Sequence, residues 1–310
     1  MDWARKALKA VRRFAARRAI SLISPPPTPR VGLALGGGFA RGISHIGVLR
    51  AFEKAGIRVD CIAGVSVGAL IATAYAAGAS LAEMEKLGAA TQFKDFGRWT
   101  LSWLGLASNQ RLEAYLRRIC PAKSFDELKI PLSIVATDLG TGDPVEFSRG
   151  EVCSPLRASC AYPGLFLPVQ HEGRLLVDGF LAAPVPVDAV RRLGADFVVA
   201  VYLDSSPPDV KPTSMFDVIG RSFAIMQRHA NSSWQRRADV VITPDVAHFA
   251  WDDFRATPQL IAAGEAAAEA VLPKILAVLK PNTTPSAAPA MAPVPLQPIL
   301  PAPTSTSTAD

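Results

Sequence analysis

The chain has 310 residues, of which 49% are hydrophobic, and carries a formal net charge of +6. This length and composition suffice for one large α/β domain or two small ones. The whole net charge lies in residues 1–18, which hold seven basic residues and one acidic residue, while the other 292 residues hold 26 of each sign. A nucleic-acid-binding surface on the body of the protein is therefore not expected.

Residues 1–23 have the spacing of a basic amphipathic helix, with Trp3, Val11 and Phe14 on one side and most Lys and Arg residues on the other. The segment lacks the unbroken apolar run of a secretory signal. Three interpretations remain: a membrane-surface helix, an organelle-type transit segment, and a solvated helix packed on the body. We favour the first, because each Lys or Arg near an anionic leaflet contributes about 1 kcal/mol to binding.

Composition divides the rest of the chain into three segments. Residues 24–30 form a Pro-rich linker, which is expected to be stiff and extended. Residues 31–280 form the folded body. Residues 281–310 are rich in Pro, Ala, Ser and Thr and are predicted to be disordered, because they hold too few large apolar residues to fold alone.

Strand-like and helix-like segments alternate along the body, which predicts an α/β fold with a largely parallel sheet covered by helices. The predicted strands are 31–35, 59–63, 132–137, 174–177, 196–203 and 239–242, and the predicted helices include 40–55, 67–77 and 258–279. Residues 61–82 carry no charged side chain, which also resembles a transmembrane helix. We reject that interpretation because glycine, serine and threonine lower the apolarity of the run. A buried strand followed by a buried helix explains the lack of charge equally well.

A glycine cluster, Gly36-Gly37-Gly38-Phe39-Ala40-Arg41-Gly42, follows the first predicted strand and opens a helix. Free backbone N–H groups at such a point bind anions. A dinucleotide site is disfavoured, because the glycines are out of register for G-x-G-x-x-G and only Asp60 could hold a ribose. The other interpretation is an oxyanion hole formed by the Gly37 and Gly38 amides. Arg41 could orient this loop or form a surface ion pair.

The next strand ends at the pentapeptide Gly64-Val65-Ser66-Val67-Gly68, and an alanine-rich helical segment follows. This is the pattern of a nucleophile elbow, in which a serine occupies a cramped turn between strand and helix. Residues two before and two after the serine must lack bulk, as Gly64 and Gly68 do. Ser66 is therefore the candidate nucleophile.

A serine nucleophile needs a proton acceptor, and several carboxylates and imidazoles could serve. The candidate acids, each after a predicted strand, are Asp138, Asp178 and Asp204, and the candidate histidines downstream are His229 and His248. Spacing alone does not choose among them, although Gly179 after Asp178 would permit a tight turn. His45 lies inside the first predicted helix, where we expect it to serve packing.

The four cysteines have no C-x-x-C spacing, which favours reduced thiols in a cytosolic chain over disulfides or a zinc site. The four histidines are scattered, and no H-E-x-x-H motif is present. We therefore expect neither a metal nor a cofactor.

Taken together, these motifs resemble the patatin-like phospholipase family, and in particular its small bacterial members. The matching blocks, in family order, are Leu33 to Gly38 with Arg41-Gly42 and His45 to Leu49, Gly64 to Gly68, Ala136 to Leu139 with Thr141-Gly142, Arg157 to Cys160 with Pro163-Gly164 and Phe166, and Asp178-Gly179. The resemblance spans about residues 30 to 205. It implies a three-layer α/β/α fold and a Ser66–Asp178 dyad without histidine.

The resemblance also implies an oxyanion hole at Gly37 and Gly38, with Gly36, Arg41, Gly42, Gly64, Gly68 and Gly179 in support. Two aromatic residues depart from the family pattern: Phe39 stands where a small residue is usual, and Phe180 follows the Asp178-Gly179 pair. The usual Asp-Asn pair is replaced by Ala183-Pro184. These changes affect the expected shape of the substrate pocket and spare the dyad.

The implied function is hydrolysis of fatty-acyl esters of phospholipids or lysophospholipids by a cytoplasmic protein that associates peripherally with membranes through residues 1–23. The alternative is a catalytically weak lipid-binding or regulatory protein on the same fold. The sequence does not determine the acyl chain, the head group or the oligomeric state.

Overall fold

The computed structural model describes residues 28–279, with the exception of residues 96, 101, 119, 205–210, 213–214 and 230–232. At residues 93, 216, 228 and 229 it describes the backbone only. The predicted basic helix, most of the linker and the tail lie outside these residues. All described residues belong to one compact unit, 26–279.

Eight of the described strands form the central sheet, in the order β10-β9-β1-β2-β5-β8-β7 with β6 paired to β5, and β3 and β4 form a separate hairpin. The pairs from β10 to β5 along this order are parallel, and those of β6, β7 and β8 are antiparallel. The strands are β1 Val31–Leu35, β2 Cys61–Gly64, β3 Arg98–Trp99, β4 Ala107–Ser108, β5 Leu132–Asp138, β6 Pro144–Phe147, β7 Val169–His171, β8 Arg174–Asp178, β9 Phe197–Val201 and β10 Val240–Ile242.

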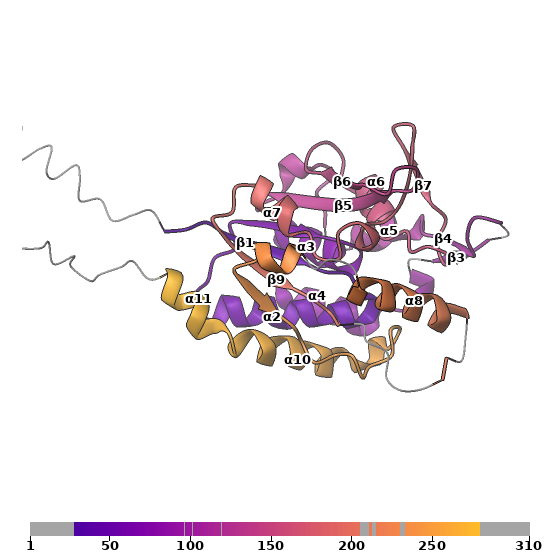
Figure 1. The fold of residues 1–310 in the computed structure, drawn as a ribbon. Coiled ribbons are helices and arrows are strands. Elements are labelled where there is room, and N and C mark those ends of the chain that lie inside the picture. Colours follow the sequence, from indigo (N-terminus) through magenta and orange to yellow (C-terminus); the bar gives the residue numbers. More distant parts are fainter. Residues whose placement is uncertain are drawn as a thin grey trace, which may run out of the picture. The chain divides into compact units, whose positions relative to one another are not determined.

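Helices cover both faces of the sheet and make three layers (Figure 1). The helices are α2 Ser44–Lys54, α3 Val67–Ala77, α4 Leu81–Ala90, α5 Arg111–Leu116, α6 Cys153–Ser159, α7 Val187–Arg192, α8 Met215–His229, α9 Ser233–Arg237, α10 Thr257–Glu269 and α11 Leu272–Leu279. The predicted three-layer α/β/α fold with a largely parallel sheet is confirmed.

Alternating side chains of the strands serve the two faces, as the two-residue period of a strand requires. Leu33 and Ile62 join the larger core under α2, α3 and α10, while Ala34 and Ala63 join a smaller core under α7. The central strands are buried along their whole length. That explains why their sequences read as continuous apolar runs.

Two predicted helices are interrupted. The segment predicted as helix 40–55 begins with a 3₁₀ turn at Phe39–Ile43 and becomes α2 only at Ser44. The segment predicted as 258–279 breaks between Glu269 and Leu272. Pro273 explains the break, because proline lacks an amide donor and fits only the first turn of a helix, here the start of α11.

The uncharged run 61–82 is divided among β2, α3 and the start of α4. Across the described residues, we find no helix with both the length and the apolarity needed to span a bilayer. The four cysteines all lie in the described part of the chain and form no disulfide there.

Candidate active site

Ser66 lies in the tight turn between β2 and α3, directly before the first residue of the helix. Its backbone has φ 53° and ψ −128°, a region that residues with a side chain rarely occupy. The neighbouring backbone is packed so closely that a Cβ on Gly64 would lie 2.5 Å from the Ala69 backbone, and one on Gly68 would collide with the Leu35 carbonyl oxygen. Glycine is therefore required at both positions.

A hydrogen-bonded chain through Ser159 holds the backbone of Ser66. The Ser66 amide donates to the Ser159 hydroxyl oxygen at 2.9 Å, and the Ser159 hydroxyl donates to the Val135 carbonyl at 2.6 Å. Ser159 is fully buried at the end of α6. Ser159 belongs to one of the matching sequence blocks, but no local motif predicts its role, because the turn that it supports lies 93 residues earlier in the chain.

Asp178 ends β8 and is fully buried. The Phe180 amide donates to its Oδ1 at 3.1 Å. Burial raises the pKa of Asp178 to about 7, although hydrogen bonding to the Phe180 amide and to the Ser66 side chain lowers it. Because the Ser66 side chain acts on the pKa of Asp178, the two side chains are neighbours. The Asp178 Oδ2 is buried without a well-formed hydrogen bond among the described residues, so one acceptor oxygen of the carboxyl is unused.

The glycine loop after β1 also approaches Ser66. A Cβ on Gly37 would lie 3.4 Å from the Ser66 Cβ. The Gly36 amide donates to the Val201 carbonyl at 3.0 Å, whereas the Gly37 and Gly38 amides find no acceptor among the described residues. The Gly37 amide is therefore a free donor close to Ser66, while Gly38 packs against Leu203.

His45 and Arg41 tie this loop to its surroundings. The His45 ring is fully buried, and its Nε2–H donates to the Gly36 carbonyl at 2.9 Å. Burial lowers the pKa of His45 to about 4, so the ring is neutral at pH 7. The Arg41 guanidinium donates to the carbonyls of Phe249 and Ala247 at 2.8 to 3.3 Å. Arg41 therefore connects the loop to the segment before α10, and the nearby Asp204 carboxylate also acts on its charge.

The remaining supporting glycines also lie in close contacts. A Cβ on Gly36, Gly42 or Gly179 would approach a neighbouring atom to 3.0 Å or less. Asp60, the one acid that a dinucleotide site could use, instead accepts a hydrogen bond from the Val31 amide at 2.8 Å.

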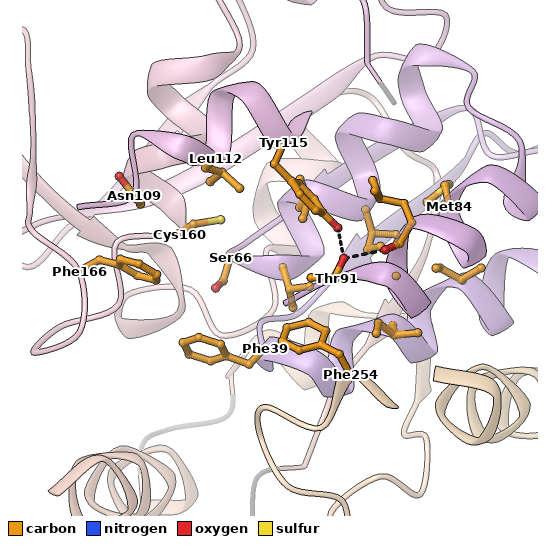
Figure 2. A pocket seen from close by; sticks show the side chains of 17 residues that line it. Phe39, Ser66, Met84, Thr91, Asn109, Leu112, Tyr115, Cys160, Phe166 and Phe254 are labelled. Atoms are coloured by element: carbon orange, nitrogen blue, oxygen red, sulfur yellow. Dashed lines mark hydrogen bonds between the residues drawn. The ribbon is translucent and has the colours of Figure 1, made fainter. Parts of the chain in front are cut away.

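Two cavities meet at Ser66. A narrow apolar pocket of about 90 Å³ runs from Ser66 toward Met84, with Tyr115 on one wall and Phe254 on the opposite wall (Figure 2). Thr91 also lines this pocket, and its hydroxyl is hydrogen-bonded to the Tyr115 hydroxyl at 2.6 Å. The second cavity is open and larger, about 630 Å³, and is lined by Ser66, Asp178, the glycine loop and residues of α8.

Phe39 and Phe180, the two aromatic departures from the family pattern, both line the open cavity. Their rings contact Tyr162, with centroids 5.2 Å and 5.7 Å from its ring. Phe223 of α8 packs edge-on against Phe180 at 5.3 Å. The departures therefore build an aromatic wall that joins the loop after β1 to α8.

The other candidate bases make different contacts. Among the described contacts, His248 lines the open cavity but pairs with Asp245 at 3.6 Å and forms no hydrogen bond with Ser66 or Asp178. Asp138 accepts a hydrogen bond from the Gly140 amide and lies 4.0 Å from Arg174. Asp204 lines a third cavity, to which Pro184 and Tyr202 also contribute. The side chain of His229 is outside the described residues.

In the described part of the chain, no group of His, Cys, Asp and Glu side chains could hold a metal ion. The Ser66 hydroxyl, the Asp178 carboxyl and the Gly37 amide are the types of group that acyl transfer uses.

Comparison with known proteins identifies relatives over the same region. An uncharacterised NTE family protein of Mycobacterium bovis is 37% identical over 194 residues, which cover 58% of this chain and 50% of the relative. A protein named lysophospholipase nte1, from Aspergillus fumigatus, is 32% identical over 198 residues, which cover 60% of this chain and 13% of that protein. The chain thus spans half or less of the length of these relatives.

A solved structure of human GIVD cytosolic phospholipase A2 aligns with 81% of this chain and 60% of its own, with a TM-score of 0.47 and 12% identity. Residues 33–191, about half of the chain, match the patatin-like phospholipase family. They include residues 33–35 of β1, the glycine loop, the turn at Ser66 and the end of β8 at Asp178. The chain therefore belongs to the patatin-like phospholipase family.

Proposed function

We propose that this protein is a serine acyl hydrolase that cleaves fatty-acyl esters of phospholipids or lysophospholipids. The observation that carries the proposal is the position of Ser66. It occupies a strained turn beside the buried Asp178 and the free Gly37 amide, at the junction of an apolar pocket and an open cavity.

In the proposed reaction, the Ser66 Oγ attacks the acyl carbonyl carbon while Asp178 accepts the hydroxyl proton. The Gly37 and Gly38 amides stabilise the negative oxygen of the tetrahedral intermediate. Asp178 then returns the proton to the departing alcohol oxygen, which leaves an acyl ester on Ser66. In the second step Asp178 takes a proton from water as the water oxygen attacks the acyl carbonyl carbon. The bond from that carbon to the Ser66 Oγ then breaks, Asp178 returns the proton to the Oγ, and the fatty acid is released.

The pKa of Asp178 suits this double role. A carboxyl group with a pKa of about 7 is largely ionised just above neutral pH and is basic enough to accept a proton from serine or water. An exposed aspartate, with a pKa of about 3.9, would be a much weaker base.

The two cavities support the substrate class. The narrow pocket is lined almost wholly by apolar side chains, such as Ile46, Leu70 and Met84, which suits a fatty-acyl chain. Lys211 and Arg221 line the open cavity and would attract a phosphate-bearing head group. The similarity to a protein named lysophospholipase supports lysophospholipids within this class.

A fluorophosphonate probe tests the proposal directly, because it bonds covalently only to an activated serine. We expect the full chain to be labelled and the Ser66→Ala variant not to be. Ser133→Ala is a matched control, since the Ser133 hydroxyl is buried without a hydrogen bond among the described residues and its loss should leave labelling intact. Labelling followed by fatty-acid release from lysophosphatidylcholine supports the hydrolase. A wild-type chain that is not labelled would overturn it and favour a non-catalytic lipid-binding protein.

A further inference from the structure

The most exposed large apolar side chains of the described residues gather on two elements. Four lie on the hairpin of β3 and β4 or next to it: Trp99, Trp103, Leu104 and Leu106, with exposed fractions of 63%, 104%, 65% and 38%. Four more lie on α8: Met215, Val218, Ile225 and Met226. Only Leu139 and Val278 complete this set among the described residues. A scattered exposed leucine is ordinary, but this concentration on two elements is not.

The four α8 residues share one side of the helix, because positions 215, 218, 225 and 226 follow the helical repeat. The opposite side of the helix faces the open cavity, to which it contributes Gly220, Phe223, Ala224 and Gln227. Helix α8 is therefore a wall of the cavity whose outer surface is apolar.

One short segment, 162–167, joins the hairpin and α8. The Leu106 and Ala107 amides both donate to the Leu165 carbonyl, at 3.1 and 2.8 Å, and the Leu167 amide donates to the Ala107 carbonyl at 2.9 Å. On its other side, the segment contacts α8 through Tyr162, whose ring lies 5.7 Å from that of Phe223.

The same segment lines both cavities at Ser66. Leu165 borders the open cavity, and Phe166 borders the apolar pocket. The two exposed apolar elements therefore flank the mouth of the site, at the same end of the molecule in Figure 1.

The surface around the hairpin is basic. Residues 94–118 hold five basic side chains, all exposed, and two acidic ones. The exposed basic side chains are Lys94, Arg98, Arg111, Arg117 and Arg118. Exposed tryptophan and leucine with an excess of exposed lysine and arginine in the same stretch of chain are the composition of a surface that enters the interfacial region of an anionic bilayer.

We infer that the β3–β4 hairpin and the outer face of α8 form a docking surface for a bilayer that contains anionic phospholipids. Trp103 and Leu104 enter the interface, and the basic side chains bind the head groups. The mouth of the site then faces the membrane, so that a lipid can pass between the hairpin and α8 to Ser66. This inference rests on the proposed function only for what happens to the lipid at Ser66, namely its hydrolysis. It adds a membrane contact distinct from residues 1–23.

Binding of the full chain to vesicles tests the inference. The vesicles are phosphatidylcholine mixed with an equal part of phosphatidylglycerol, and pure phosphatidylcholine for comparison. We expect stronger binding to the anionic vesicles, and about tenfold weaker binding to them by the Trp103→Ser/Leu104→Ser double variant. Val278→Ser is the matched control, because Val278 is 48% exposed on α11, at the opposite end of the molecule in Figure 1, and should bind as the wild type does.

A second measurement reports on the hairpin even where residues 1–23 dominate the total binding. Brominated lipids quench tryptophan fluorescence at contact distance. We expect Trp103→Phe to keep its affinity for vesicles, because an apolar ring remains, and to lose part of the quenching. Unchanged thermal unfolding of all variants shows that the exposed substitutions leave the fold intact.

Three results would overturn the inference. The first is unchanged vesicle binding and unchanged quenching in the Trp103 variants. The second is a loss of binding in Val278→Ser as large as that in the double variant. The third is self-association of the wild type that the double variant abolishes, which would assign the surface to a second copy of the chain. Fluorophosphonate labelling of Ser66 is measured separately. Hairpin-dependent vesicle binding without labelling would support the docking surface and reject the hydrolase. Labelling without hairpin-dependent binding would support the hydrolase and reject the docking surface.

Discussion

The Ser66 amide donates a hydrogen bond to the hydroxyl oxygen of Ser159, 2.9 Å away and 93 residues later in the chain. A strained turn is stable only where its surroundings determine it fully, and this bond gives the strained residue a buried partner. Ser159 passes the bond on to the Val135 carbonyl of β5, so the central sheet supports the turn through α6. Ser159 touches the Ser66 backbone, and we treat it as a positioning residue.

Replacing Ser159 by alanine should leave the Ser66 amide without a partner in the interior. We expect a loss of about 1–3 kcal/mol in the free energy of unfolding, because a buried donor would be unpaired. Turnover of a soluble ester should fall through kcat, with KM little changed. Urea unfolding and steady-state kinetics measure the two effects. The matched control is Ser133→Ala, which removes a buried hydroxyl of β5 that has no hydrogen bond in the described part of the chain and should change neither quantity much.

The proposed dyad predicts strongly non-additive kinetics. We expect Ser66→Ala and Asp178→Asn each to lower kcat by about a thousandfold or more, and the double variant to be hardly worse than Ser66→Ala, since the two groups act as a unit. Ester hydrolysis under single-turnover conditions measures this. His248→Ala should keep nearly full activity, because His248 pairs with Asp245 and not with the dyad. Activity that survives in Asp178→Asn and is lost in His248→Ala would overturn the dyad in favour of a histidine base.

The pH dependence of turnover should follow the ionisation of Asp178. The pKa of this carboxyl is about 7, and only the ionised form accepts a proton from Ser66. We therefore expect kcat/KM for a soluble ester to rise with pH and reach half of its plateau near pH 7. At pH 5 it should be about one hundredth of the plateau, because about 1% of the carboxyl is then ionised. A profile that is flat from pH 5 to pH 8 would contradict this assignment.

The same carboxyl should make the fold less stable at high pH. The folded-state pKa of Asp178, about 7, exceeds the value of about 3.9 expected in the unfolded chain. Its contribution to stability is therefore complete below about pH 4 and is lost as the pH rises through 7. Asparagine does not ionise, so Asp178→Asn should raise the melting temperature relative to the wild type at pH 8 and have a smaller effect at pH 5.

Thermal unfolding of the wild type and of Asp178→Asn at pH 5 and pH 8 provides the test. An equal shift in melting temperature at both pH values would reject the raised pKa of Asp178. The His45 ring, whose pKa burial lowers to about 4, acts with the opposite sign. Its contribution is lost as the pH falls from about 6.5 toward 4. Because both chains contain His45, its effect cancels in the comparison.

The apolar pocket should set the acyl-chain length that the protein accepts. Gly88 of α4 lines this pocket, and a Cβ there would meet its nearest neighbour, Ile43, at 3.7 Å, an ordinary contact. A Gly88→Leu side chain would fill the pocket. We expect about a tenfold loss of kcat/KM for a long-chain ester, since one or two buried methylene contacts are worth that much, and little change for an acetate ester. Gly88→Ala is the control for helix stability, which alanine should increase by about 0.5–1 kcal/mol. An equal loss on both esters would place the acyl chain elsewhere.

Local signals predicted the elements near the site well. The strand at 31–35 and the helix at 67–77 have the predicted bounds, because each is a continuous apolar or alanine-rich run that ends at glycine. The hairpin of β3 and β4 was not predicted. Its two strands have two residues each, and the second is held mainly by backbone hydrogen bonds to segment 165–167, which no pattern in residues 98–108 reveals.

The sequence by itself determined the family, the α/β order and the candidates Ser66, Asp178, Gly37 and Gly38. These depend on local requirements, namely apolar runs, glycines without room for a Cβ, and motifs with their characteristic spacing. Only the tertiary structure decided what surrounds these residues. The support from Ser159, the burial that raises the pKa of Asp178, the meeting of two cavities at Ser66 and the exposed tip at Trp103 all depend on contacts between segments far apart in the chain. Such contacts arise only when the sheet and its helices have packed together, so no single stretch of sequence contains them.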